Sequence, residues 1–74
     1  MLVKLNILFN SGITKEGYTE TQKTGTTDIL REIIGEDNIN NSFTTIRFDK
    51  DEYGLIRVNE IAAISVDCSK TYSL

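Results

Sequence analysis

Residues 43–60 read Phe43-Thr-Thr-Ile-Arg-Phe-Asp-Lys-Asp-Glu-Tyr-Gly-Leu-Ile-Arg-Val-Asn-Glu60, and this stretch decides the fold. Two runs rich in β-branched, aliphatic and aromatic residues, 43–49 and 55–58, flank a charged centre. Such runs on either side of a polar turn are typical of the two strands of a β-hairpin. Residues 59–60 then form a corner before a last strand. The stretch therefore predicts an antiparallel hairpin in the C-terminal half of the chain.

The segment 49–60 also resembles the calcium loop of the EF-hand family. Asp49, Asp51 and Glu60 stand at loop positions 1, 3 and 12, where carboxylates chelate the ion. Gly54 stands at position 6, where glycine makes the sharp turn of that loop. The resemblance implies a calcium site formed by these three carboxylates.

Two residues that depart from the calcium-loop motif, and the residues on either side of the segment, favour the hairpin over the calcium loop. Tyr53 stands at position 5, where an oxygen ligand is expected, and Arg57 places a cation at position 9. The motif needs a helix on each side, but residues 42–48 are typical of a strand. In an extended arm, every residue carries Glu60 roughly 3.3 Å further from the turn. We therefore predict that Asp49, Asp51 and Glu60 hold no metal.

The N-terminal half predicts a second hairpin. Residues 2–9 alternate between apolar and polar side chains, as in a half-buried strand. Residues 10–12 (Asn-Ser-Gly) supply a turn. A more polar second arm follows over 13–21, interrupted by Gly17. We expect this arm at an edge of the sheet, where polarity is tolerated.

One short helix is predicted between the two hairpins. Thr26 or Thr27 can cap it, Asp28 favours its first turn, and Gly35 suits its C-terminal end. An apolar stripe runs along one side of this helix: Ile29, Leu30, Ile33 and Ile34. A polar connection, 36–42, follows, with Ile39 as an expected anchor.

Together these elements predict a single small α+β domain over residues 1–68, with the order β-β-α-β-β-β. The last strand carries Ile64, Val66 and Cys68 on one face, and residues 69–74 form a polar tail that we expect to fray. A mostly antiparallel sheet covered by one helix is the main prediction. A β-grasp arrangement, with the same element order, and a small β-barrel are the alternatives.

The composition excludes several classes of function. The chain has no histidine, which removes the commonest general base and metal ligand, and we predict no enzyme activity and no cofactor. Its 8 basic and 11 acidic residues form no basic cluster, so nucleic-acid binding is not expected. The three tyrosines, Tyr18, Tyr53 and Tyr72, are interpreted as packing on the sheet surface. The single cysteine excludes an internal disulfide and is expected to be an inert thiol. No apolar run approaches a membrane span or a signal peptide, so we expect a cytoplasmic protein with no membrane partner.

The C-terminal run Ile46-Arg-Phe-Asp…Gly54-Leu-Ile-Arg-Val-Asn-Glu-Ile-Ala-Ala-Ile-Ser-Val66 resembles the endings of short uncharacterised proteins of low-GC Gram-positive bacteria and their phages. The resemblance implies a phage or plasmid accessory protein. We predict a non-enzymatic interaction module that forms a homodimer or higher homo-oligomer, because one helix cannot cover the whole sheet. The alternative is an acidic inhibitor of net charge −3 that binds a basic site on a host protein.

Overall fold

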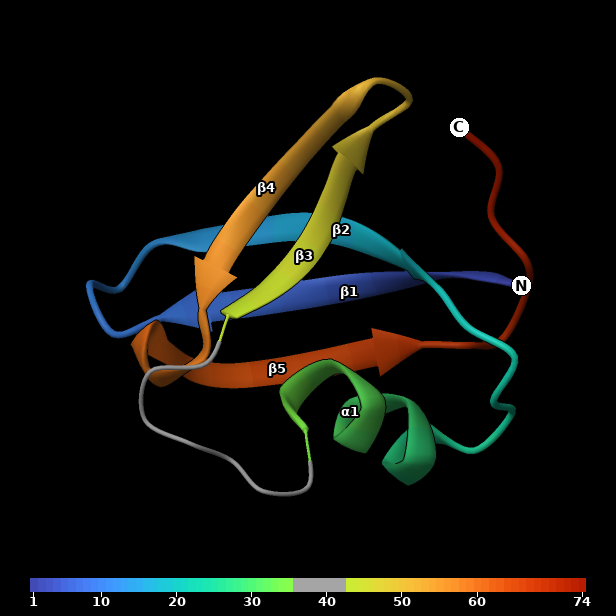
Figure 1. The fold of residues 1–74 in the computed structure, drawn as a ribbon, viewed down its shortest axis with the longest axis horizontal. Coiled ribbons are helices and arrows are strands. Elements are labelled where there is room, and N and C mark those ends of the chain that lie inside the picture. The colour runs from blue at the N-terminus through green and yellow to red at the C-terminus, as the bar shows by residue number, and fades with distance from the viewer. Residues whose placement is uncertain (36–42) are drawn as a thin grey trace.

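Five strands, one α-helix and a 3-10 turn make up the described part of the chain (Figure 1). The computed structural model describes residues 1–35 and 43–74, so the predicted connection 36–42 and its anchor Ile39 lie outside the described residues. The elements follow in the order β1 (Leu2–Phe9), β2 (Thr14–Glu20), α1 (Thr26–Ile34), β3 (Phe43–Asp49), β4 (Glu52–Arg57), η1 (Val58–Glu60) and β5 (Ile61–Asp67).

The five strands form one antiparallel sheet in the order β4-β3-β2-β1-β5. The predicted α+β class and element order are therefore confirmed. The sheet does not close, so the barrel alternative is wrong. The β-grasp alternative shares the element order, but here β1 and β5 are antiparallel neighbours. The expectation that the second arm lies at an edge is also wrong, because β2 lies between β1 and β3.

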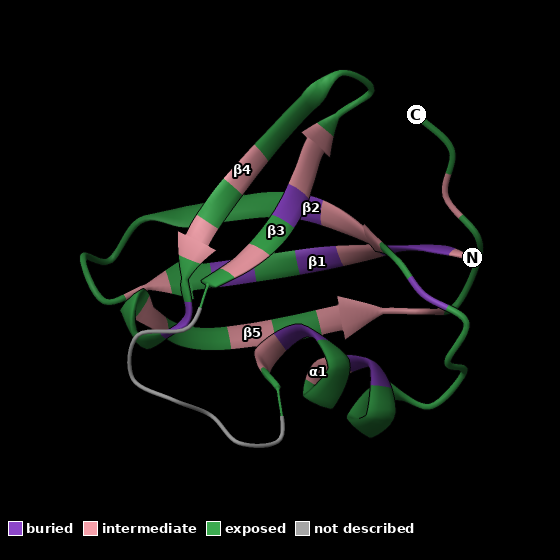
Figure 2. Cartoon of the chain, viewed as in Figure 1, coloured by how far each residue is buried: buried purple, intermediate pink, exposed green. Residues whose placement is uncertain are grey.

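The core lies on one face of the sheet, under α1. The odd-numbered residues Val3, Leu5 and Ile7 of β1 are almost fully buried there, as their alternation predicts (Figure 2). Ile29 and Ile33, one helical turn apart, bring the apolar stripe of α1 onto them. Ile64, Val66 and Cys68 of β5 and its end pack at the border of this cluster, on the face that the sequence assigns to them.

The β3–β4 hairpin joins the rest of the sheet mainly through side-chain packing. The β2–β3 register contains a single residue pair, Tyr18 with Arg47, and the hairpin crosses the other strands at a steep angle (Figure 1). At the crossing, Ile46 is fully buried against Gly17. A Cβ atom on Gly17 would overlap Cγ2 of Ile46. Gly17 therefore lies inside a continuous β2 and makes room for Ile46, instead of interrupting the strand.

The C-terminal hairpin has the predicted strands but a different turn. β3 ends at Asp49 and β4 begins at Glu52, so the two connecting residues are Lys50 and Asp51. Gly54 lies within β4, where the ring of Phe48 covers its Cα and leaves no space for a Cβ atom. Gly54 allows the aromatic ring to approach the backbone closely, and its predicted place in the turn is wrong. The arm also ends one residue early, because Val58 belongs to η1, which makes the predicted corner.

The helix ends differ in part from the prediction. Gly25 is the N-cap residue and α1 has no side-chain cap, so the predicted caps at Thr26 and Thr27 are wrong. Gly35 has φ of 86° and its N–H donates to the carbonyl of Arg31, as expected of a C-terminal glycine. Among the described residues, no helix has the length and apolar character needed to cross a membrane.

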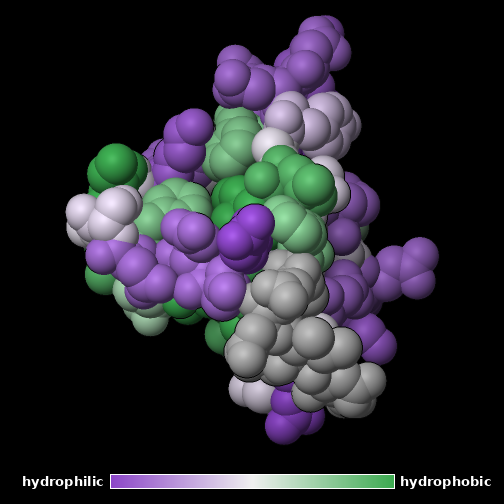
Figure 3. Space-filling model, turned by 60° about the vertical axis from the view of Figure 1, so that its left-hand side comes forward, coloured by the Kyte–Doolittle hydropathy of each residue, from purple (hydrophilic) through white to green (hydrophobic). Residues whose placement is uncertain are grey.

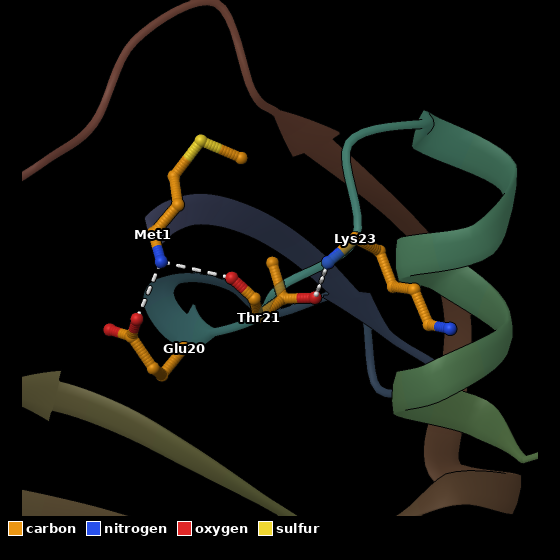
Figure 4. Close-up of polar contacts among 4 residues, drawn as sticks. All are labelled: Met1, Glu20, Thr21 and Lys23. Atoms are coloured by element: carbon orange, nitrogen blue, oxygen red, sulfur yellow. Dashed lines mark hydrogen bonds and ion pairs between the residues drawn. The ribbon is translucent and has the colours of Figure 1, made fainter.

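A small polar network holds the passage from β2 to α1 (Figure 4). Thr21 donates its backbone N–H to the carbonyl of Met1 at 2.9 Å and accepts the Met1 amino group at its own carbonyl, also at 2.9 Å. The Thr21 hydroxyl accepts the N–H of Lys23 at 3.0 Å. Thr21 is the buried polar residue of the described chain, and these bonds satisfy it where the chain leaves the sheet.

We expect Gly17→Ala to lower the free energy of unfolding by about 1–3 kcal/mol, because the added methyl group overpacks the site under Ile46. Chemical denaturation measures the change. Gly25→Ala is the comparison, because the nearest atom to its added Cβ is Asp28 Oδ2 at 3.5 Å, an ordinary contact. That variant should lose less than about 1 kcal/mol, from the cap alone. Equal losses in the two variants would contradict the packing role of Gly17.

Candidate functional site

The structure separates the three carboxylates of the calcium-loop resemblance. Asp49 and Asp51 lie at the turn of the hairpin, whereas Glu60 lies in η1, beyond the six residues of β4. Six extended residues span roughly 20 Å, which places Glu60 at the far end of the strand. Asp49 accepts the N–H of Lys50 at 2.7 Å and serves the turn itself. Within residues 1–35 and 43–74, no three metal-ligating side chains gather at one point.

The largest exposed apolar side chains of the sheet gather on the face of the hairpin that points away from α1. Phe43, Tyr53 and Leu55 are 51%, 60% and 68% exposed. The register places Phe43 opposite Arg57, Thr45 opposite Leu55 and Arg47 opposite Tyr53. These six residues are called the hairpin face below. Figure 3 shows hydrophobic surface between the hydrophilic tip and the grey atoms.

An arginine stacks on an aromatic ring at each end of the hairpin face. The guanidinium carbon of Arg47 lies 5.4 Å from the centre of the Tyr53 ring, and that of Arg57 lies 5.4 Å from the centre of the Phe43 ring. Arg47 is also held by the carbonyl of Lys50 at 2.7 Å. Neither arginine forms an ion pair with a described carboxylate. The face is therefore apolar at its centre and positively charged at both ends.

The polar tail adds Tyr72 to the same side of the sheet. Its N–H donates to the carbonyl of Leu2 at 2.9 Å, its hydroxyl donates to Asp67, and its ring lies 5.8 Å from that of Tyr18. A hollow of about 120 Å³ between Tyr18, Tyr53 and Arg47 connects this region with the hairpin face. Tyr72 thus departs from the expected fraying and covers the part of the sheet next to the hairpin face.

Hydrogen bonds around Asp67 move two pKa values apart. The hydroxyl of Ser69, then that of Tyr72, donates to the carboxylate and lowers the pKa of Asp67 to about 2. The same bond to Asp67 raises the pKa of Tyr72 to about 12. Each shift favours the protonation state that the hydrogen bond needs, an ionised Asp67 and a protonated Tyr72.

Sequence reasoning found the hairpin but missed the surface that it presents. The clue lies in the shared pattern of the strands: 43–47 reads Phe-Thr-Thr-Ile-Arg and 53–57 reads Tyr-Gly-Leu-Ile-Arg. Both carry an aromatic residue, then isoleucine and arginine at the third and fourth positions after it. Antiparallel pairing of two such strands places each aromatic residue opposite an arginine. The contact between Tyr18 and Tyr72 had no comparable local signal.

The comparisons with known proteins add no further assignment. The chain matches no protein-family model, no curated protein and no solved structure. Any function is therefore inferred from the geometry of the chain itself.

We expect no calcium binding at 49–60, because β4 holds Glu60 away from Asp49 and Asp51. Calorimetric titration should give no dissociation constant below about 10⁻⁴ M, the range of functional loops of this type. Asp51→Asn is the matched variant and should leave the titration unchanged. A tighter constant that this variant abolishes would contradict the hairpin geometry.

The Tyr72 contact should make stability depend on pH at both ends of the scale. The lowered pKa of Asp67 contributes stability above pH 3.8 that is lost as the pH falls towards about 2. The raised pKa of Tyr72 contributes stability below pH 10 that is lost as the pH rises towards about 12. Unfolding curves across these ranges measure both effects.

Tyr72→Phe is the test variant, because it keeps the ring and removes the donor. Its loss of stability between pH 10 and 12 should be smaller than that of the unmodified chain, and the pKa of Asp67 should rise towards 3.8. Tyr53→Phe is the control, because Tyr53 lies on the hairpin face, away from Asp67. An unchanged Asp67 titration in Tyr72→Phe would show that the tail is not held in this way.

Proposed function

We propose that this protein is a non-enzymatic interaction module that binds other protein surfaces, including a second copy of itself, through the hairpin face. One observation carries the proposal: Phe43, Tyr53 and Leu55 are each more than half exposed and lie together on one hairpin. Contiguous exposed apolar surface on a small domain is typical of a protein-binding site. Aromatic residues and arginine are also the types enriched at the centres of such sites.

The aromatic side chains of the hairpin face are held by contacts within the chain. Its central Leu55 lies between two aromatic rings, and the stacked arginines restrict those rings before any partner arrives. Side chains already held in one conformation lose less entropy on binding. No catalytic group is needed for this role, and the absence of histidine from the chain agrees with it.

Small size favours self-association as the first use of this surface. A chain of 74 residues buries only about 60% of its unfolded surface when it folds alone. Burying the hairpin face between two copies would add apolar contact without a larger core. The resemblance of the C-terminal run to short proteins of low-GC Gram-positive bacteria and their phages supports a role as a phage or plasmid accessory protein.

The hairpin tip supports the second candidate, an acidic inhibitor of a host protein. Asp49, Asp51 and Glu52 are exposed there, next to a single Lys50. A basic site on a partner would meet these carboxylates first, because the tip projects from the sheet (Figure 1). Capture from a low-GC Gram-positive lysate with the unmodified chain and with Asp51→Lys tests this candidate. A basic partner that is lost with the variant would favour it, and equal capture would count against it.

We expect the molecular mass in solution to rise above 8.3 kDa at tens of micromolar, because apolar surface is buried when copies associate. Light scattering across a concentration series measures it. Leu55→Ser should weaken association about tenfold or more, and Ile13→Ser should not. The two residues are 68% and 63% exposed, but Ile13 lies at the β1–β2 turn. A constant mass near 8.3 kDa would contradict self-association.

A further inference from the structure

β4 carries the same pattern of side chains as β3, the strand that pairs with its inner edge. The outer edge of β4 could therefore pair with a strand of similar sequence. Along the hairpin face, β3 shows Phe43, Thr45 and Arg47, and β4 shows Tyr53, Leu55 and Arg57. On the opposite face, Ile46 of β3 lies across from Gly54 of β4. Residue by residue, each position in 53–57 corresponds to the position ten places earlier in 43–47.

We propose that β4 pairs with β4 of a second copy about a twofold axis at Leu55, so that the partner strand occupies an equivalent of the place of β3. The inference rests on the proposed self-association and names its surface and register. In such a ladder, the numbers of two residues that face each other add up to 110. Leu55 then faces its own copy, and Tyr53 faces Arg57 of the second copy.

The register follows from the chemistry of the pairs. The β3–β4 ladder already places an arginine across from an aromatic ring twice, with guanidinium-to-ring distances of 5.4 Å. The twofold pairing repeats this pair twice more, between Tyr53 of each copy and Arg57 of the other. It also places Ile56 of one copy across from Gly54 of the other, as Ile46 lies across from Gly54 within one chain. The edge is therefore complementary to itself in this register.

Neighbouring registers lack this match. A shift of the twofold centre from Leu55 to Gly54 places Tyr53 across from Leu55, and Arg57 then faces no aromatic residue of the second copy. A shift to Ile56 places Tyr53 across from Asn59, so that it faces no arginine of the second copy. In the described residues, no strand occupies the outer edge of β4, and unpaired backbone groups along an edge favour the addition of a further strand. A second copy is a partner whose sequence fits that edge from Tyr53 to Arg57.

Cysteine cross-linking tests the register directly in a Cys68→Ser background, in which each introduced cysteine is the single thiol of its chain. Directly paired residues have Cα atoms about 4.5–5.5 Å apart, within the range of a disulfide. Leu55→Cys should therefore give a covalent dimer under mild oxidation. Tyr53→Cys should not, because the pairing separates it from its own copy by roughly 13 Å along the strand.

A mixture of Tyr53→Cys and Arg57→Cys chains should also cross-link, because these positions face each other. This result together with a cross-link at position 55 supports the twofold pairing. Equal cross-linking of Leu55→Cys and Tyr53→Cys chains would overturn it. A dimer seen by light scattering with no cross-link at position 55 would also overturn it, while self-association through another surface would stand. A monomer at all concentrations would overturn self-association and this pairing with it, while binding of the hairpin face to other proteins would stand.

Charge exchange at Leu55 gives a second, independent measurement that needs no thiol. Leu55→Lys and Leu55→Glu chains should each stay monomeric, because like charges would face each other at the twofold axis. Mixing the two should restore a dimer containing one chain of each kind, seen by light scattering or native mass spectrometry. Ile13→Lys is the control and should dimerise like the unmodified chain. Failure of the mixture to associate while this control dimerises would overturn the pairing. Leu55 is 68% exposed, so these variants should keep the fold.

Discussion

The contact of Ile46 with Gly17 is the constraint on which the rest of this structure depends. The chain contains two hairpins, and the ladder between them amounts to one register pair at Tyr18 and Arg47. Hydrogen bonding alone would hold the second hairpin weakly. Ile46 reaches across β2 into the core beside Leu5 and Ile7, and only a residue without a Cβ atom allows that approach. The core therefore unites the two hairpins and sets the steep angle between them.

That angle also explains why the hairpin face is exposed. The core side chains Ile46 and Phe48 point towards α1, and the alternation of a strand then turns Phe43, Thr45 and Arg47 outward. The tail covers the neighbouring region through Tyr72 and Tyr18. Exposure of Leu55 and Tyr53 thus follows from the packing of their neighbours, and the stacked arginines shield the rings in the free chain.

Local patterns were enough to predict the elements, and long-range contacts account for the errors. The alternation of Val3, Leu5 and Ile7 and the helical stripe at Ile29 and Ile33 are strong local signals, and both were confirmed. Gly17 and Gly54 look like an interruption and a turn in sequence. Their roles depend on Ile46 and Phe48, which no local window identifies as neighbours.

The same limit applies to the position of β2 and to the tail. The polar character of β2 suggested an edge, but strand order depends on where β3 returns, and that is a property of the whole chain. The tail is polar in sequence, and its contact with Leu2 and Asp67 appears only when β5 ends beside β1. For the hairpin face, the repeated aromatic-X-X-Ile-Arg pattern was present in the sequence. Only the register of β3 and β4 shows that this pattern places each aromatic residue across from an arginine.

An exposed apolar edge is a hazard for a small protein, and the pattern along β4 limits the hazard. A strand that paired with a different edge of the next copy would continue into a fibre, whereas pairing of β4 with itself uses that edge once and ends at two copies. Arg57 penalises registers in which it meets another cation or loses its aromatic partner. The side chains that favour association of β4 therefore also restrict the strands with which it can pair. A closed twofold pair satisfies these restrictions.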